Sequence, residues 1–241
     1  MITGRPQQNP KNRKILALIP ARAGSKRIKD KNIRLLNGIP LFRWSEATAI
    51  LSGLFDKIIL STDSDEYAKM SMVEVLIRPP ELCRDESSDY DVISHCLSHY
   101  PGCDLLAYLR PTTPFRAATL IGEVIQTMID AGDNASGLRS VEEMSESAYK
   151  CFRLEFGRLI PAIVSRGDMT DIPNQECPKT YRPNGYVDVI KAEIVKNGAL
   201  WGDKKIGFVT PKTIEIDTEA DLLYAQWWAT HRMIREEVIW R

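Results

Sequence analysis

Residues 14–32 read KILALIPARAGSKRIKDKN, and this stretch decides the fold class. Its first part, residues 14–20, is a short apolar run between charged residues, which is typical of a strand buried on both faces of a parallel sheet. Its second part is a loop with one glycine and many lysines and arginines. In open α/β sheets, ligands bind beyond the carboxyl ends of the strands. We therefore expect a ligand-binding loop directly after this strand.

The composition of the loop indicates which ligand it binds. Gly24 allows backbone N–H groups to approach an anion closely, and arginine and lysine neutralise phosphate charge. The alternative is a solvated basic loop, but the position at a strand end favours phosphate binding. Neither a GxxxxGK[ST] loop nor a GxGxxG fingerprint is present.

The rest of the chain alternates apolar runs with segments of helical periodicity. We expect strands at residues 14–20, 57–62, 74–77, 104–109, 134–141, 186–190 and 206–209, and helices at 41–51, 64–70, 90–99, 117–131 and 218–232. This alternation predicts an α/β fold with a mostly parallel sheet and helices on both faces. Periodicity weakens between residues 142 and 183, which predicts an arm or insertion. The domain is expected to span residues 14–241, after a flexible polar segment at residues 1–13.

Charge and composition exclude several classes of protein. The 241 residues, 44% of them hydrophobic, suit one large α/β domain. Lys plus Arg and Asp plus Glu are both 32, which argues against a protein that coats nucleic acid or an anionic membrane. The charge is uneven, because residues 1–34 carry a net +9 and the remainder a net −9. We expect neither a nucleic-acid nor a membrane partner.

The sequence also predicts a cytoplasmic location. No apolar run reaches the roughly 18 residues of a membrane-spanning helix, and the polar N-terminus lacks the apolar core of a secretory signal. Five scattered cysteines without a CxxC pair fit reduced thiols in a cytoplasmic protein.

A second candidate site lies near the C-terminus, where residues 214–221 read IEIDTEAD. Glu215 and Asp217 alternate along an extended run, so both can face the same side. Two carboxylates on one side suit Mg²⁺, which prefers oxygen ligands and shares a nucleotide's phosphate oxygens. A strand edge followed by a helix cap at Asp217 or Thr218 explains the residues equally well.

Four other features of the sequence give weaker signals. The stretch at residues 109–116, LRPTTPFR, is a rigid strand-end loop or merely a stiff connection. Residues 182–185, RPNG, predict a turn before a strand, where Arg182 could hold a carboxylate. His95 and His99 lie four apart, more typical of a structural helix face than of a metal pair. We interpret three tryptophans as packing or interface anchors: Trp227, Trp228 and Trp240.

Taken in order, these pieces resemble the acylneuraminate cytidylyltransferase family, the CMP-sialic acid synthetases and their nonulosonate relatives. The resemblance extends from about residue 15 to about residue 226 and rests on IPARAGSKRIKDKN, IILSTD, RPPEL with DESS after it, LRPTTPFR, YRPNG and IEIDTEADL. It implies a Rossmann-like nucleotidyltransferase fold, CTP as co-substrate, Mg²⁺ or Mn²⁺ as cofactor and pyrophosphate as product. It also implies a homodimer in which residues 142–183 form a small dimerisation arm.

The resemblance assigns roles to individual residues. Nucleotide binding falls to Ala21, Arg22, Gly24, Ser25, Lys31, Asn32, Arg78 and Ser88, with Lys26 in the same loop. The sugar side comprises Arg110, Thr112, Arg182, Asn184, Gly185 and Tyr186. Arg22, Lys31 and Asp217 are the implied catalytic residues. Asp217 is also the implied metal ligand, joined by Glu215 where the family often has aspartate.

The expected reaction is transfer of CMP from CTP to the anomeric hydroxyl of a 2-keto sugar acid. Arg110 replaces a glutamine that lies near the sugar in many members, and Tyr186 and Asp188 are bulkier or charged. These departures favour a legionaminic- or pseudaminic-type acceptor over plain N-acetylneuraminate. The alternatives are a Kdo-type or other sugar nucleotidyltransferase, and a non-catalytic paralogue that binds nucleotide sugars.

Overall fold

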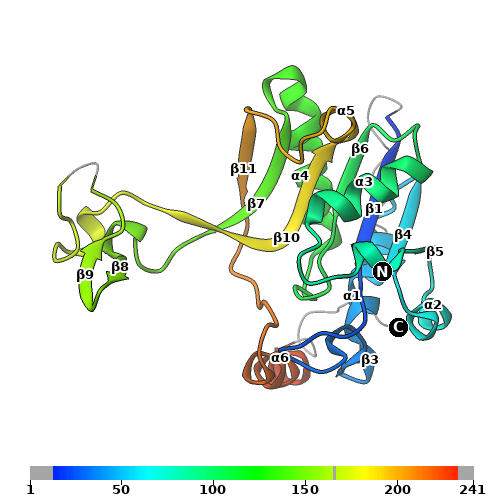
Figure 1. The fold of residues 1–241 in the computed structure, drawn as a ribbon, viewed down its shortest axis with the longest axis horizontal. Helices are drawn as coiled ribbons and strands as arrows, with labels where there is room; N and C mark the ends of the chain where they lie inside the picture. The colour runs from blue at the N-terminus through cyan, green and yellow to red at the C-terminus, as the bar shows by residue number, and fades with distance from the viewer. Residues whose placement is uncertain (1–12, 165–166, 233–241) are drawn as a thin grey trace.

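A seven-stranded sheet forms the centre of the computed structural model, which describes residues 13–164 and 167–232 (Figure 1). The strands lie in the order β11-β7-β10-β6-β1-β4-β5. Their bounds are β1 Ile15–Pro20, β4 Lys57–Thr62, β5 Glu74–Ile77, β6 Leu105–Tyr108, β7 Gly137–Glu143, β10 Tyr181–Lys191 and β11 Lys205–Val209. Strand β10 runs antiparallel to β6 and β7, and the other pairs are parallel. The predicted mostly parallel sheet is confirmed.

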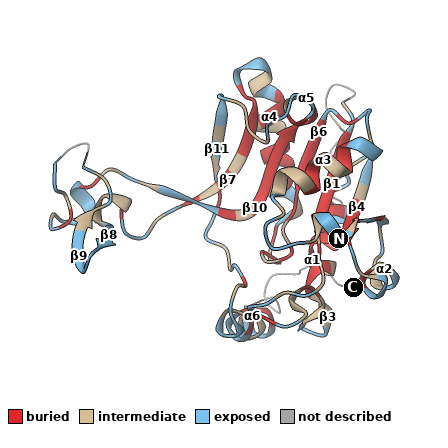
Figure 2. Ribbon diagram, in the orientation of Figure 1, coloured by how far each residue is buried: buried red, intermediate tan, exposed pale blue. Residues whose placement is uncertain are grey.

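Helices cover both faces of this sheet, and strand β1 explains why. Its residues Ile15, Ala17 and Ile19 pack with helices α1 (Leu41–Ser52) and α4 (Ala118–Ala131). Leu16 and Leu18, on the opposite face, pack with α3 (Asp89–His99) and α5 (Ala192–Lys196). Because successive side chains of a strand alternate between faces, a strand covered on both sides must be apolar throughout. Figure 2 shows the central strands as buried.

A third apolar cluster brings side chains from residues 28–44 together with side chains from residues 216–229. Helix α6 (Glu219–Arg232) lies beside the short hairpin β2 (Leu35–Leu36) and β3 (Ile39–Pro40), as Figure 1 shows. Ile28 and Ile216 both belong to this cluster and are almost completely buried. Their burial brings the basic loop after β1 against the carboxylate segment at residues 214–217, although nearly two hundred residues separate them in sequence.

The stretch that was expected to form an arm, residues 142–183, lies partly outside the body of the molecule (Figure 1). Strands β7 and β10 extend past the other strands of the sheet, and residues 144–164 and 167–180 project from the body (Figure 1). The end of the arm carries the hairpin β8 (Phe152–Glu155) and β9 (Arg158–Pro161). Leu154 and Leu159 are exposed there, and Phe156 is fully exposed. The role of this arm in dimerisation stays a prediction.

Strand β10 corrects one prediction. Residues 182–185 do not form a turn ahead of a strand, because they lie within β10, which begins at Tyr181. Its register against β7 shifts between Pro183 and Asp188, and Gly185 has a φ of 66° in the left-handed region. A Cβ at Gly185 would lie 2.9 Å from Thr113 Oγ1, so this bulge requires glycine for two reasons.

The other predicted helices and strands differ less from the observed ones. The helix expected at 64–70 is α2 (Asp65–Met70), capped by Ser64, whereas α5 and the β2–β3 hairpin were not predicted. Residues 1–12 of the predicted flexible segment, and Trp240, lie outside the described residues. None of the helices in the described part of the chain combines the length and apolarity needed to cross a bilayer.

Candidate functional site

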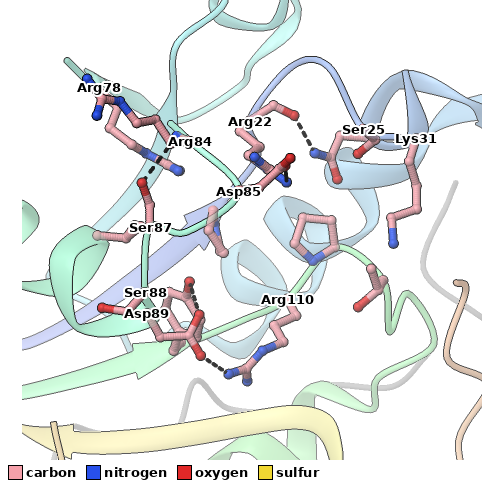
Figure 3. Close-up of a pocket in the computed structure, with 16 residues that line it drawn as sticks. Arg22, Ser25, Lys31, Arg78, Arg84, Asp85, Ser87, Ser88, Asp89 and Arg110 are labelled. Carbon is pink, nitrogen blue, oxygen red and sulfur yellow. Dashed lines mark hydrogen bonds and ion pairs between the residues drawn. The ribbon is translucent and has the colours of Figure 1, made fainter. Parts of the chain in front are cut away.

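A cavity of about 280 Å³ opens at the carboxyl ends of β1, β5 and β6 (Figure 3). Strand β6 lies on one side of β1 and β4 and β5 on the other, so the cavity is at the point where the strand order reverses, the usual ligand position in such sheets. The loop after β1 contributes Arg22, Ser25, Lys31 and Asn32; the segment after β5 contributes Arg78, Arg84, Asp85 and Ser88; β6 and its following loop contribute Tyr108, Arg110 and Thr112.

Hydrogen bonds hold the basic loop in shape. The side chain of Asn32 donates to the carbonyl of Arg22 at 2.9 Å, and the backbone N–H of Ala23 donates to Asp63 at 2.8 Å. Gly24 has a φ of 71°, which favours glycine. Ala21 is buried in the core below the loop, and its N–H donates to the carbonyl of Ser61. The loop is therefore prearranged around the cavity mouth.

A second cavity, of about 340 Å³, adjoins the first and has Asp217 in its wall. The ammonium of Lys31 donates to Asp217 Oδ1 at 3.0 Å and to the carbonyl of Ile216 at 3.1 Å. The Lys31 side chain is only 14% exposed, and Arg27 lies 3.9 Å from the other oxygen of Asp217. Two of the predicted catalytic residues thus lie in direct contact, and Arg22 lines the same cavity.

Asp85 lies between two cations of the basic loop. Arg22 donates to its Oδ1 at 2.8 Å and to the carbonyl of Cys83 at 3.1 Å, while Lys26 pairs with its Oδ2. Hydrogen bonds from Lys26 and Arg22 lower the pKa of the Asp85 carboxyl, and the Asp85 carboxylate raises the pKa of Lys26. Figure 3 shows the Asp85 side chain directed at Arg22.

Two of the predicted nucleotide-binding residues, Arg78 and Ser88, lie at the opposite wall. Arg78 is buried and donates to the hydroxyl of Ser61 at 3.1 Å and to its carbonyl at 2.9 Å. Ser88 is the N-cap of α3 and forms a capping box with Asp91. Both residues line the cavity, and their part in nucleotide binding stays a prediction.

Arg110 belongs to a network of charges at the cavity floor. It donates to Asp89 at 2.5 Å and to Asp188 at 2.7 Å, and Arg139 donates to both oxygens of Asp188 at 3.1 Å. Burial acts to lower the pKa of Arg110, but the carboxylates of Asp188 and Asp89 outweigh it and raise that pKa. Burial, with Asp89 beside it, raises the pKa of Tyr108, whose hydroxyl donates to Asp89. Asp188 therefore holds the Arg110 side chain in place and keeps it charged at the cavity floor.

The structure does not bring all predicted sugar-side residues to the cavity. Arg110 and Thr112 line it. Arg182 instead pairs with Glu142 at 2.7 Å, and Asn184 is buried with its amide donating to Thr210 at 2.6 Å. Tyr186 is buried too, and its hydroxyl accepts from the N–H of Ala117.

Gly185 lies nearer the cavity, because the nearest heavy atoms to a Cβ there would include Arg110 Cδ at 3.6 Å. Buried Arg116 joins the bulge to the loop after β6, donating to the carbonyls of Arg110 at 2.6 Å and Gly185 at 3.0 Å. The predicted contact of these β10 residues with a sugar stays a prediction.

The two carboxylates near the second cavity suit a divalent cation. Partial burial raises the pKa of Glu215, and the neighbouring Asp217 carboxylate raises it further, so a cation would relieve the repulsion. No group of three or more His, Cys, Asp or Glu side chains gathers within residues 13–164 and 167–232. Mg²⁺ prefers oxygen ligands and usually keeps several waters beside one or two carboxylates, so this carboxylate pair matches the ligand type that it takes. His95 and His99 contact each other with ring centroids 4.7 Å apart, and they belong to no such group in the described chain.

Several residues of the site escaped the sequence analysis. Arg84, Asp85 and Asp89 line the cavity from the segment that follows β5, and Tyr108 lines it from the end of β6. Arg78 and Ser88 of this segment were assigned to nucleotide binding from the sequence. The rule that ligands bind beyond strand ends extends that expectation to the other three residues, because the segment follows a predicted strand. The pairing of Asp188 and Arg139 with Arg110 has no local signal, since it needs the antiparallel register of β10.

The fold and the site define an α/β protein with cation-lined cavities at the point where the strand order reverses. Seven Lys or Arg and three Asp line the two cavities, and this net positive wall suits a polyphosphate. A cytidylyltransferase family model matches residues 16–155, more than half of the chain. The chain belongs to this cytidylyltransferase family.

Individual relatives agree with that family. An N-acylneuraminate cytidylyltransferase of Escherichia coli O18:K1:H7 is 40% identical over 116 residues, 47% of this chain and 28% of the relative. One of Streptococcus agalactiae serotype V is 28% identical over 227 residues, 88% of this chain and 52% of the relative. The chain thus spans about half, or less, of the length of these two enzymes.

Two further similar proteins match this chain over nearly their whole length. The post-translational flagellin modification protein B of Campylobacter coli is 27% identical over 218 residues, 86% of this chain and 91% of that protein. A CMP:2-keto-3-deoxy-manno-octonic acid synthetase solved with CTP has a TM-score of 0.69 at 16% identity and covers 90% of this chain and 98% of its own. The predicted Rossmann-like nucleotidyltransferase fold is confirmed.

Proposed function

We propose that this protein transfers CMP from CTP to the anomeric hydroxyl of a sialic-acid-like 2-keto sugar acid and releases pyrophosphate. The observation that carries the proposal is the pair of adjoining cavities lined by Arg22, Lys31 and five further cations, in a chain of the cytidylyltransferase family. Relatives named N-acylneuraminate cytidylyltransferase support the sugar class.

The chemistry follows from where the charges lie. The anomeric hydroxyl loses its proton to water as its oxygen attacks the α-phosphorus. The bond from that phosphorus to the oxygen of the β-phosphate breaks, and the negative charge develops on the leaving pyrophosphate. Such transfers depend mainly on positioning and charge neutralisation. Arg22 and Lys31 supply the neutralisation at the cavity mouth. Asp217, with Glu215 beside it, would hold Mg²⁺ or Mn²⁺, which screens phosphate charge when bound.

The remaining predicted residues divide the substrates between them. Arg78 and Ser88 would read the cytosine from the wall after β5, with Ser25 and Asn32 nearer the phosphates. Arg110 and Thr112 would face the sugar acid. Arg182, Asn184, Gly185 and Tyr186 would act on the sugar side by holding the β10 bulge next to Arg110. A second copy of the chain would join through the arm.

A pyrophosphate-release assay with CTP, Mg²⁺ and a panel of nonulosonic acids tests the proposal. The panel needs acids besides N-acetylneuraminate, because Arg110 and Asp188 change the cavity floor. We expect Lys31→Ala and Asp217→Ala each to lower kcat/KM at least about 100-fold, the usual size for loss of one charge-stabilising group. Lys205→Ala removes an exposed lysine on edge strand β11 and should leave kcat/KM unchanged. Full activity in both site variants would refute the proposal.

The same assay separates the alternatives. Turnover of a Kdo-type acid, or of another nucleoside triphosphate, would reassign the chain to a different sugar nucleotidyltransferase. CTP binding without turnover of any acid would favour a non-catalytic paralogue. A thermal-shift panel of nucleotides supplies the binding measurement, since a ligand at 100-fold its Kd stabilises by about 2.7 kcal/mol.

A further inference from the structure

The two cavities share one dividing wall. Arg22, Ser25, Lys31 and Asp85 line both of them, and Asp85 reaches this wall from the segment after β5 while the other three belong to the loop after β1. Ligand pockets usually measure about 300–1,000 Å³. The first cavity, of about 280 Å³, lies just below this range, and the second, of about 340 Å³, lies near its lower limit. A nucleoside triphosphate with its base in the first cavity and its phosphates in the second must cross this wall.

The Asp85 carboxylate is held as a phosphate would be. Its two oxygens contact different cations, Oδ1 with Arg22 at 2.8 Å and Oδ2 with Lys26. The Arg22 guanidinium is also anchored on the carbonyl of Cys83, so it keeps its place when the carboxylate leaves. Asp85 is 39% exposed and Lys26 is 80% exposed, so these ion pairs are weak and can exchange for another anion.

We propose that Asp85 is an internal stand-in for a phosphate group of the substrate. Its carboxylate occupies the Arg22–Lys26 site in the free enzyme, leaves when a triphosphate binds across the wall, and returns when pyrophosphate departs. This inference rests on the proposed function, because it assigns one phosphate position within that site. Asp85 lowers the affinity for phosphate ligands, and in return it favours release of the product.

Titration calorimetry of Asp85→Asn with CTP, and separately with inorganic pyrophosphate, tests the inference. Without the competing carboxylate, both ligands should bind about three- to tenfold more tightly, the size expected for loss of two exposed ion pairs. Product inhibition by pyrophosphate should strengthen by a similar factor. Asp85→Glu keeps the competing charge and should stay close to the native affinity.

Glu86→Gln is the matched control, because Glu86 is exposed, neighbours Asp85 and acts on Lys26 only through the weaker attraction of its charge, whereas Asp85 pairs with Lys26 directly. It removes the same charge from the same segment and should gain little. An equal gain in both variants, or unchanged or weaker binding to Asp85→Asn, would overturn the inference.

The two probes separate this inference from the proposed function. If pyrophosphate binds but CTP is never turned over, the proposed reaction fails while the pyrophosphate titration still decides the role of Asp85. If the native protein binds neither ligand, no phosphate site exists for Asp85 to occupy, and both proposals fall. Thermal unfolding of each variant confirms that the substitution leaves the fold intact, as expected for exposed positions.

Discussion

Single carboxylates in this protein differ widely in how the fold treats their charge. Glu46, on helix α1, has no exposed surface, accepts hydrogen bonds from Ser71 at 2.6 Å and from the N–H of Met72 at 3.2 Å, and lies 3.4 Å from Arg43. Burial raises its pKa above the ordinary 4.5, although these partners oppose the shift. The exposed Glu74 has its pKa lowered instead, by hydrogen bonds from Lys57 and Tyr100.

These opposite shifts predict opposite effects of pH on stability. The folded state binds a proton at Glu46 more tightly than the unfolded state does, so its contribution is fully present below pH 4.5 and is lost as pH rises through the folded pKa. Urea denaturation between pH 4 and 7 measures the free energy of unfolding. That free energy should fall less with rising pH in Glu46→Gln than in the native protein.

Glu74→Gln is the control of opposite sign. The contribution of Glu74 is present above pH 4.5 and is lost as pH falls through its lowered pKa. Its replacement should flatten the loss of stability towards acid. The same pH dependence in Glu46→Gln and in the native protein would contradict the assignment of Glu46.

At the scale of elements, the start of helix α6 positions Asp217, the predicted catalytic carboxylate. The hydroxyl of Thr218 accepts from the N–H of Asp221 at 3.2 Å, and Asp221 accepts from the N–H of Thr218 at 2.8 Å. Asp217 directly precedes this cap and is free to meet Lys31. Thr218 therefore caps the helix, as one interpretation of residues 214–221 expected, and Asp217 lines the second cavity. Metal binding at Asp217, the other interpretation, stays a prediction.

Removal of the cap should affect both stability and the site. Thr218→Ala is expected to lower the free energy of unfolding by about 1 kcal/mol and to raise the KM for CTP, because Asp217 loses its fixed position. Thr230→Ala, near the other end of the same helix, removes a hydroxyl bonded to the carbonyl of Gln226 and should leave KM unchanged. Equal KM values in the two variants would show that the cap does not position Asp217.

At the scale of the whole molecule, the arm is difficult to explain in an isolated chain. Leu154 and Leu159 are 72% and 64% exposed, and Phe156 is fully exposed on a hairpin far from the core (Figure 2). Exposed apolar side chains that cluster in this way mark interaction surfaces. A second copy of the chain is the partner that the family resemblance implies.

Light scattering after gel filtration checks that assembly. The native protein should be a dimer, and a triple variant with serine at Leu154, Phe156 and Leu159 should be a monomer with an unchanged body, because these side chains support no core. Leu223→Ser, at a 71% exposed position on α6, is the control and should stay dimeric. A monomeric native protein would remove the arm's proposed role.

Local sequence by itself determined the sheet, most of its helices and the loop after β1. These features depend on short-range periodicity, as in the alternation of Ile15–Pro20 between two covered faces, and on residues that follow a strand directly. For the same reason, Arg22, Ser25, Lys31 and Asn32 could be predicted together.

Tertiary structure alone decided which distant charges meet. The contact of Lys31 with Asp217 depends on burial of Ile28 and Ile216 in one cluster, and the pairing of Asp188 with Arg110 depends on the bulged antiparallel strand β10. The placement of Asp85 between Arg22 and Lys26 depends on β1 and β5 ending at the same edge of the sheet. Such contacts join segments far apart in the chain, so packing of the core sets them, and local sequence carries no record of the partner.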